Sequence, residues 1–196
     1  MAQQRGTLIV LNGASSAGKT STAQALGAIL GTQCVHTGFD DILDRAQPFG
    51  PEDPAGRMGQ WLRSLRITWF RLTDGRLRLF KRLHREVVAL AQAGHTIIVD
   101  TSLMDRRALQ DAAACFASLG GFLIGMKPPL AVSEQWEAAR ADRPPGHARH
   151  HYDLIHAHGI YDLVLDPSQM TPHECAIAIV RRVEEAPPNA FHRLLQ

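Results

Sequence analysis

The sequence predicts an α/β fold of three layers, in which a five-stranded parallel sheet carries helices on both faces. Two observations predict it. Five short apolar runs alternate with helical patterns, and a glycine-rich loop joins the first run to the first helix. Parallel strands that are buried on both faces give continuous apolar runs, and strands that alternate with helices favour a parallel sheet.

Each expected strand is an apolar run of four to six residues, short enough for a strand and too short for a buried helix. The expected strands are Thr7–Asn12, Cys34–Thr37, Thr96–Asp100, Gly121–Met126 and Tyr161–Asp166.

Helical patterns fill the gaps between these runs, with Gly94 as a C-terminal stop and Thr171-Pro172 as an N-terminal start. The expected helices are Lys19–Leu30, Lys81–Ala93, Asp105–Ser118, Ser133–Ala141 and Thr171–Glu185.

The segment between the second run and the second of these helices is less regular. Pro48–Gly59 is rich in proline and glycine and predicts a loop. Ile67–Leu72 and Arg76–Phe80 flank Thr73-Asp74-Gly75, which predicts a β-hairpin. Such an insertion either covers an acceptor site or is decorative.

Residues 13–20 read Gly-Ala-Ser-Ser-Ala-Gly-Lys-Thr, a complete G-x-x-x-x-G-K-[ST] phosphate-binding loop. Its glycines let backbone N–H groups face a polyphosphate, and the following helix start adds positive partial charge. Lys19 is expected to reach the β- and γ-phosphates and Thr20 to bind Mg²⁺. The chain is therefore expected to have a P-loop NTPase fold and to bind a nucleoside triphosphate with Mg²⁺. The expected nucleotide-binding residues are Gly13, Ala14, Ser15, Ser16, Ala17, Gly18, Lys19, Thr20 and Ser21.

Composition excludes several classes of protein. A length of 196 residues suits one domain, so residues 1–196 are expected to form a single P-loop domain. A net charge of +2 is too balanced to indicate a nucleic-acid or anionic-membrane partner. Three cysteines without C-x-x-C spacing indicate reduced thiols. No apolar run approaches a membrane span and residues 1–6 lack a signal-peptide pattern, so we expect a cytoplasmic protein.

Two acids follow expected strands at the edge where α/β sheets bind ligands. Asp100 ends the third strand and is a candidate for the metal or the substrate side, the alternative being a helix cap or a solvated acid. Asp40 follows the second strand and is a candidate general base, because a carboxylate can orient a hydroxyl and take its proton. The alternative for Asp40 is an N-cap of the helix expected at Asp41–Arg45.

Arg140 and Arg143 precede Pro144-Pro145-Gly146 and could close over a triphosphate from a mobile loop, at about residues 138–150. The alternative is a solvated helix end. Five histidines follow at positions 147, 150, 151, 156 and 158 without a zinc-binding spacing. They are expected to line a surface helix after this loop.

Several blocks that run in order over roughly residues 7–180 resemble one family. They are Leu11–Thr20, Gly38-Phe39-Asp40, Ile97–Asp100, Ala139–Arg143, His156 with Gly159–Asp166, Thr171-Pro172 and Glu174–Ala176. In these blocks the chain resembles the chloramphenicol phosphotransferase family of P-loop kinases.

The resemblance implies ATP-dependent transfer to a hydroxyl of a small molecule, such as chloramphenicol or a similar antibiotic. It implies that Asp40 is the general base and that Arg140 and Arg143 are lid arginines near the phosphates. The chain departs from the family pattern where members often carry a second acid (Thr101 here), Ser after the base (Asp41) or Gln in the lid helix (His151). No resemblance extends to residues 42–80, which should shape the acceptor pocket.

Two other functions stay open at this stage. One is a kinase of a different small acceptor, such as a sugar acid, a shikimate-like alcohol or a nucleotide-sugar. The other is a nucleotide-binding switch or adaptor that hydrolyses slowly. The chain lacks an Asn-Lys-x-Asp sequence for guanine and a Ser-Gly-Gly transporter signature, which favours a stand-alone kinase.

Overall fold

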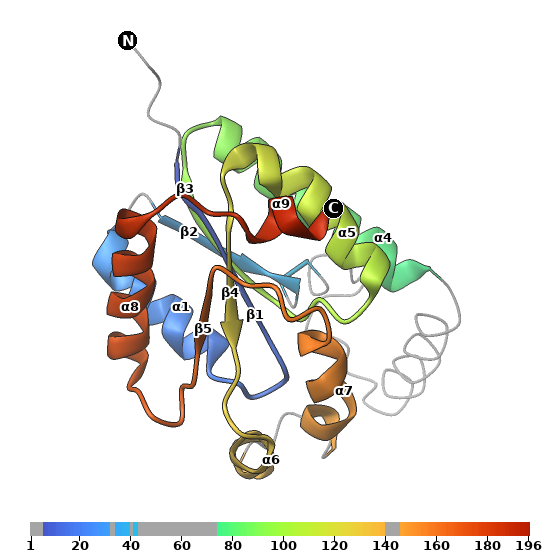
Figure 1. The fold of residues 1–196 in the computed structure, drawn as a ribbon, viewed down its shortest axis with the longest axis vertical. Coiled ribbons are helices and arrows are strands. Elements are labelled where there is room, and N and C mark those ends of the chain that lie inside the picture. Colours follow the sequence, from blue (N-terminus) through green and yellow to red (C-terminus); the bar gives the residue numbers. More distant parts are fainter. Residues whose placement is uncertain (1–5, 32–33, 40, 43–73, 140–145) are drawn as a thin grey trace, which may run out of the picture.

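A five-stranded parallel sheet forms the centre of the computed structural model, which describes residues 6–31, 34–39, 41–42, 74–139 and 146–196. The strand order is β2-β3-β1-β4-β5, so β1 lies between β3 and β4 (Figure 1). The strands are β1 (Leu8–Gly13), β2 (Cys34–Gly38), β3 (Thr96–Thr101), β4 (Phe122–Met126) and β5 (Leu163–Leu165). The predicted five-stranded parallel sheet is confirmed.

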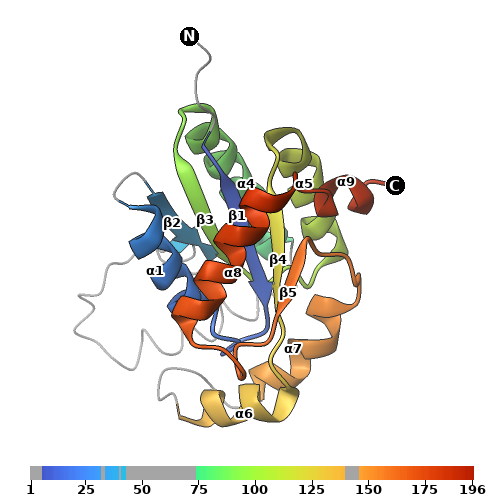
Figure 2. The ribbon, with the colours of Figure 1, turned by 60° about the vertical axis from the view of Figure 1, so that its left-hand side comes forward.

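Helices cover both faces of this sheet, which makes the three layers. The helices α1 and α8 pack together on one face, and α4, α5 and α9 lie on the other (Figure 2). The helices are α1 (Lys19–Leu30), α4 (Gly75–Gln92), α5 (Arg106–Phe116), α6 (Leu130–Ala138), α7 (His147–His156), α8 (Pro172–Glu185) and α9 (Ala190–Leu194), with a 3₁₀ turn η1 (Ala117–Leu119).

Strand β1 shows how the sequence builds two cores at once. Successive side chains of a strand point to opposite faces. Leu8 and Val10 accordingly join the core beneath α4 and α5, whereas Ile9 and Leu11 join the core beneath α1 and α8. All four are at most 1% exposed. A strand buried on both faces needs an uninterrupted apolar run, which is why its position was predictable.

Helix ends follow the local sequence signals. Thr171 caps α8 through a capping box with Glu174, and Pro172 occupies the first turn. Asp105 caps α5 by accepting a hydrogen bond from the Arg107 backbone N–H at 2.8 Å.

The predicted hairpin is wrong in its second half. Arg76–Phe80 belongs to α4, which begins at Gly75 and continues through the helix expected from Lys81. Phe80, Leu83, His84, Val87 and Ala91 are all buried on one side of α4. Their spacing of three and four residues is helical, and it outweighs the alternation of arginine and leucine that suggested a strand. Ile67–Leu72, Pro48–Gly59 and residues 43–45 lie outside the described residues.

The short helices α6 and α7 lie at the carboxyl ends of the strands, beside the loop between β1 and α1 (Figures 1 and 2). This is the edge where ligands bind in open α/β sheets. Over the described ranges, no helix is long and apolar enough to cross a membrane.

Candidate active site

The loop between β1 and α1 has the backbone conformation of a phosphate cradle. Ser16 and Gly18 adopt positive φ, at 58° and 77°. A Cβ at Gly13 would lie 2.6 Å from the carbonyl oxygen of Met126 in β4, so only glycine fits there. The N-cap residue of α1 is Gly18, which has no side chain to cap the start of the helix. A helix start of this kind, with its first N–H groups and positive partial charge, is suited to an anion.

Lys19, Thr20 and Asp100 lie together beside this loop. Lys19 Nζ donates a hydrogen bond to the Ala14 carbonyl at 2.8 Å and lies 3.8 Å from Asp100 Oδ1. Thr20 Oγ1 donates to Asp100 Oδ2 at 2.7 Å. Asp100, the second-last residue of β3, lies next to the loop because β1 and β3 are paired, with Leu11 opposite Asp100. The fold thus gathers three of the residues that the sequence predicted for phosphate and metal.

Strand β2 ends beside the backbone of Asp100. Gly38 pairs with Asp100, and a Cβ at Gly38 would lie 2.7 Å from the Asp100 carbonyl oxygen. Asp40 follows Gly38 by two residues in the sequence and lies outside the described residues.

A buried carboxylate on α6 accepts hydrogen bonds from the start of α7, which follows the two arginines in the sequence. Glu137 of α6 is 4% exposed and accepts hydrogen bonds from the Gly146 and Ala148 backbone N–H groups, at 2.7 and 2.8 Å. It therefore holds the start of α7 against the end of α6, as a cap supplied from another helix. Arg140 and Arg143 lie outside the described residues.

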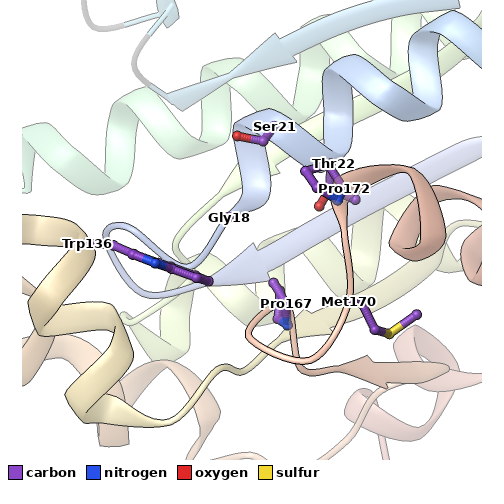
Figure 3. Close-up of a pocket in the computed structure, with 7 residues that line it drawn as sticks. All are labelled: Gly18, Ser21, Thr22, Trp136, Pro167, Met170 and Pro172. Atoms are coloured by element: carbon purple, nitrogen blue, oxygen red, sulfur yellow. The ribbon is translucent and has the colours of Figure 1, made fainter. Parts of the chain in front are cut away.

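An apolar pocket adjoins the phosphate loop on the side of α8. Its volume is about 190 Å³, and a Cβ added at Gly18 would lie 3.2 Å from Pro167 and 3.9 Å from Trp136, both of which line the pocket in Figure 3. Trp136 comes from α6, and Pro167 and Met170 come from the β5–α8 connection. The residues that line it are Gly18, Ser21, Thr22, Trp136, Pro167, Met170 and Pro172.

Comparison with known proteins identifies the family. Residues 6–184 match the model of the family described as "chloramphenicol phosphotransferase-like protein". The chain belongs to the chloramphenicol phosphotransferase-like family. Two relatives, from Mycobacterium tuberculosis strains CDC 1551 and H37Rv, are each 30% identical over 199 residues, which is 96% of this chain and 88% of theirs. Both carry the provisional name O-phosphotransferase.

This chloramphenicol phosphotransferase-like chain shares its fold with solved P-loop kinases. The Mycobacterium tuberculosis APS kinase, solved with AMPPNP and APS, is 19% identical with a TM-score of 0.62, over 92% of this chain and 99% of its own. The Acinetobacter baumannii shikimate kinase, solved with shikimate, is 13% identical with a TM-score of 0.58, over 93% and 96%. The predicted fold class and family resemblance are therefore confirmed.

Sequence reasoning missed three polar residues behind the phosphate loop of this family member. They are Asn12, Tyr161 and His156, which are linked by hydrogen bonds from Asn12 Nδ2 to Tyr161 Oη (3.1 Å) and between Tyr161 Oη and His156 Nδ1 (2.8 Å). All three stood within the family blocks, but no spacing along the chain indicated that they meet. Trp136, Pro167 and Met170 of the pocket were also missed, and they stand outside those blocks.

The histidines are not all on the surface as expected. All four of His147, His150, His151 and His156 lie on α7, but only the first three are exposed or half-buried, whereas His156 is 8% exposed. Among the described residues, no group of three His, Cys, Asp or Glu side chains is placed to hold a metal ion. Burial, together with the positive charge of Lys127, His158 and Lys19, lowers the pKa of His156 from 6.5 to about 4.

The lowered pKa of His156 predicts a loss of stability in mild acid. Between pH 6.5 and about 4, His156 binds a proton in the unfolded chain but not in the folded chain. The free energy of unfolding therefore decreases as the pH is lowered through this range and levels off below about pH 4. At about pH 5 the loss should be about 2 kcal/mol relative to neutral pH. Urea unfolding of the wild type and of His156→Asn, which keeps a polar atom near Nδ1 without titrating, measures it. Equal pH dependence in the two proteins would show that His156 contributes nothing.

Proposed function

We propose that this chain transfers the γ-phosphate of ATP to a hydroxyl of a small molecule. The observation that carries the proposal is the convergence of Lys19, Thr20 and Asp100 at a loop with phosphate-cradle geometry. The provisional O-phosphotransferase name of the curated relatives supports an oxygen acceptor. The family name makes chloramphenicol and similar antibiotics the first acceptors to test.

The apolar pocket supports a nucleotide with a base. A purine is flat and largely apolar on its faces, and Trp136, Pro167 and Met170 offer it aromatic and aliphatic surface. The pocket includes Gly18, the last residue before α1, so a base there would keep its phosphates within reach of the loop. ATP therefore suits the site better than inorganic polyphosphate.

The residues around Asp100 fit a magnesium ion. Mg²⁺ prefers oxygen ligands and keeps several waters. The Thr20 hydroxyl and the Asp100 carboxylate lie 2.7 Å apart and supply such oxygens beside the cradle. Thr20 would hold the ion directly and Asp100 would orient a bound water. When bound, the ion neutralises charge that develops between the β- and γ-phosphates.

Each of the proposed site residues has a separate role in the transfer. Lys19 leaves its contact with the Ala14 carbonyl and neutralises the β- and γ-phosphate oxygens. Asp40 accepts the proton of the acceptor hydroxyl while the acceptor oxygen forms a bond to the γ-phosphorus. In the same step the bond from the γ-phosphorus to the β–γ bridging oxygen breaks, and ADP is the leaving group. Arg140 and Arg143 lie in sequence between Glu137 and its partners Gly146 and Ala148. Their guanidinium groups bind the oxygens of the γ-phosphoryl group during transfer.

We also propose that the whole chain works as one kinase domain. Residues 42–80 would cover the acceptor and residues 138–150 would form the lid.

A magnesium titration tests the metal assignment. Thr20→Ala removes a direct oxygen ligand, so half-maximal ATP turnover should need about 10-fold more Mg²⁺. Asp100→Asn should shift the titration in the same direction, because an amide orients a bound water less well than a carboxylate. Ser118→Ala, which removes an exposed hydroxyl from η1 outside the phosphate loop, is the control and should leave the Mg²⁺ requirement unchanged. Unaltered Mg²⁺ dependence in Asp100→Asn would move this residue to the substrate side.

A further inference from the structure

The side chain of Asn12 joins three segments around the phosphate loop. Asn12 lies on β1 directly before Gly13 and is fully buried. Its Oδ1 accepts a hydrogen bond from the Leu103 backbone N–H at 2.8 Å, in the loop after β3. Its Nδ2 donates to Tyr161 Oη at 3.1 Å and, at a longer 3.5 Å, to the Ile155 carbonyl of α7.

The hydrogen bonds continue from Tyr161 into α7. Tyr161 Oη lies 2.8 Å from His156 Nδ1 and donates to the Ile155 carbonyl at 3.3 Å. The ring of Tyr161 lies against Gly125 of β4, where an added Cβ would come within 3.1 Å of three ring atoms. Gly125 therefore lets the ring sit flat on the strand, and this seating fixes the position of its hydroxyl.

A second contact ties the same two loops together. Ser102 Oγ donates to the Gly13 carbonyl at 2.8 Å, one residue away from the bond between Asn12 and Leu103. The loop after β3 is thus held at both Asn12 and Gly13. Only Thr101 separates Asp100 from this loop, so these contacts help to set the distance of Asp100 from the phosphate cradle.

Burying the side chains of Asn12, Tyr161 and His156 costs more free energy than packing alone requires. A buried amide, phenol and imidazole cost free energy unless their polar atoms are satisfied, and apolar residues would fill the same space. His156 Nε2 is buried without a hydrogen-bond partner within the part of the chain that the structure describes. Burial also raises the pKa of Tyr161, which keeps its hydroxyl neutral and able to donate.

We propose that Asn12, Tyr161 and His156 form a positioning network that sets the phosphate loop against the loop after β3 and the end of α7. The inference rests on the proposed function. None of the three residues needs to touch substrate, because the network acts on the placement of Gly13, Asp100 and α7. A misplacement of about 1 Å can cost about 100-fold in rate, whereas phosphate contacts made by the loop backbone tolerate small shifts. Loss of the network should therefore lower kcat more than it weakens ATP binding.

Two tyrosines supply a matched test. Tyr161→Phe removes a hydroxyl inside the network. Tyr152→Phe removes a hydroxyl from α7 that donates to the Pro128 carbonyl at 2.8 Å and has no bond to Asn12. We expect Tyr161→Phe to lower kcat for phosphate release from ATP about 10-fold with KM for ATP within about 2-fold. Tyr152→Phe should change neither beyond about 2-fold. Equal kcat values in the two variants would overturn the proposal.

Substitutions at His156 add a rescue test. His156→Asn keeps a polar atom near the position of Nδ1 and should retain most of the wild-type kcat, whereas His156→Leu should match Tyr161→Phe. A purely structural role predicts instead that both His156 variants keep kcat and differ only in melting temperature.

A ligand-free measurement separates the network from the proposed function. If the wild type releases no phosphate from ATP and phosphorylates no acceptor, the proposed function fails. Hydrogen exchange of the unliganded chain then decides the network alone. Exchange at the Leu103 amide should be about 10-fold faster in Tyr161→Phe than in Tyr152→Phe, because the acceptor Asn12 Oδ1 is no longer held. Equal exchange in the two variants would count against the network.

Discussion

Lys19→Ala is expected to lower phosphoryl transfer about 10²- to 10³-fold while the protein stays folded. Lys19 lies at the phosphate loop, and its structural contacts include one hydrogen bond to the Ala14 carbonyl and a 3.8 Å approach to Asp100. The rate falls because the Lys19 ammonium no longer stabilises the negative charge that develops on the transferred phosphoryl group. Initial rates at saturating ATP, with a thermal melt of each protein, measure the effect.

Lys81→Ala is the control for this substitution. It removes the same charge from α4, outside the residues gathered at the phosphate loop. Both transfer rate and melting temperature should stay close to the wild type, since substitutions away from special contacts change stability by at most about 0.5 kcal/mol. Wild-type turnover in Lys19→Ala would contradict the assignment of the loop.

Asp40→Asn should reduce transfer to the acceptor by about 10²-fold or more, the usual contribution of a positioned base. Asparagine keeps the size of the side chain and caps helices about as well as aspartate, so stability should change little. Affinity for ATP, titrated with AMPPNP, should also change little, because the proposed role of Asp40 lies on the acceptor side.

The neighbouring acid provides the control for Asp40. Asp41 is exposed, and Asp41→Asn should have only a mild effect on transfer. Near-normal transfer by Asp40→Asn together with a lower melting temperature would show that the carboxylate holds the loop instead of serving the chemistry.

The sheet was predictable because its strands are buried on both faces. A run such as Leu8 to Leu11 must be apolar at every position, so it stands out from the amphipathic helices around it. The phosphate loop was predictable for a related reason. Its glycines stand where the backbone of the loop requires them, as at Gly18 with its positive φ. The glycines therefore recur at a fixed spacing that can be recognised in the sequence.

The errors and omissions arose where the decisive contacts are distant in sequence. Arg76–Phe80 alternates like a strand, and only the burial of Phe80 with Leu83 and Val87 reveals a helix. Asn12 and Tyr161 are 149 positions apart, and the strand order alone brings β1 next to β4, where Tyr161 rests on Gly125. No periodicity in the sequence encodes such a meeting.

The most direct test of the account is a transfer assay that follows the phosphoryl group itself. ATP labelled in its γ-phosphate is incubated with Mg²⁺, the protein and a panel of hydroxylated antibiotics and metabolites that includes chloramphenicol, and products are analysed by mass spectrometry. The account predicts that one acceptor gains the labelled phosphoryl group on oxygen, that ADP forms in equal amount, and that Lys19→Ala abolishes most of both. Label that appears only as inorganic phosphate, at a rate that no acceptor changes, would contradict it.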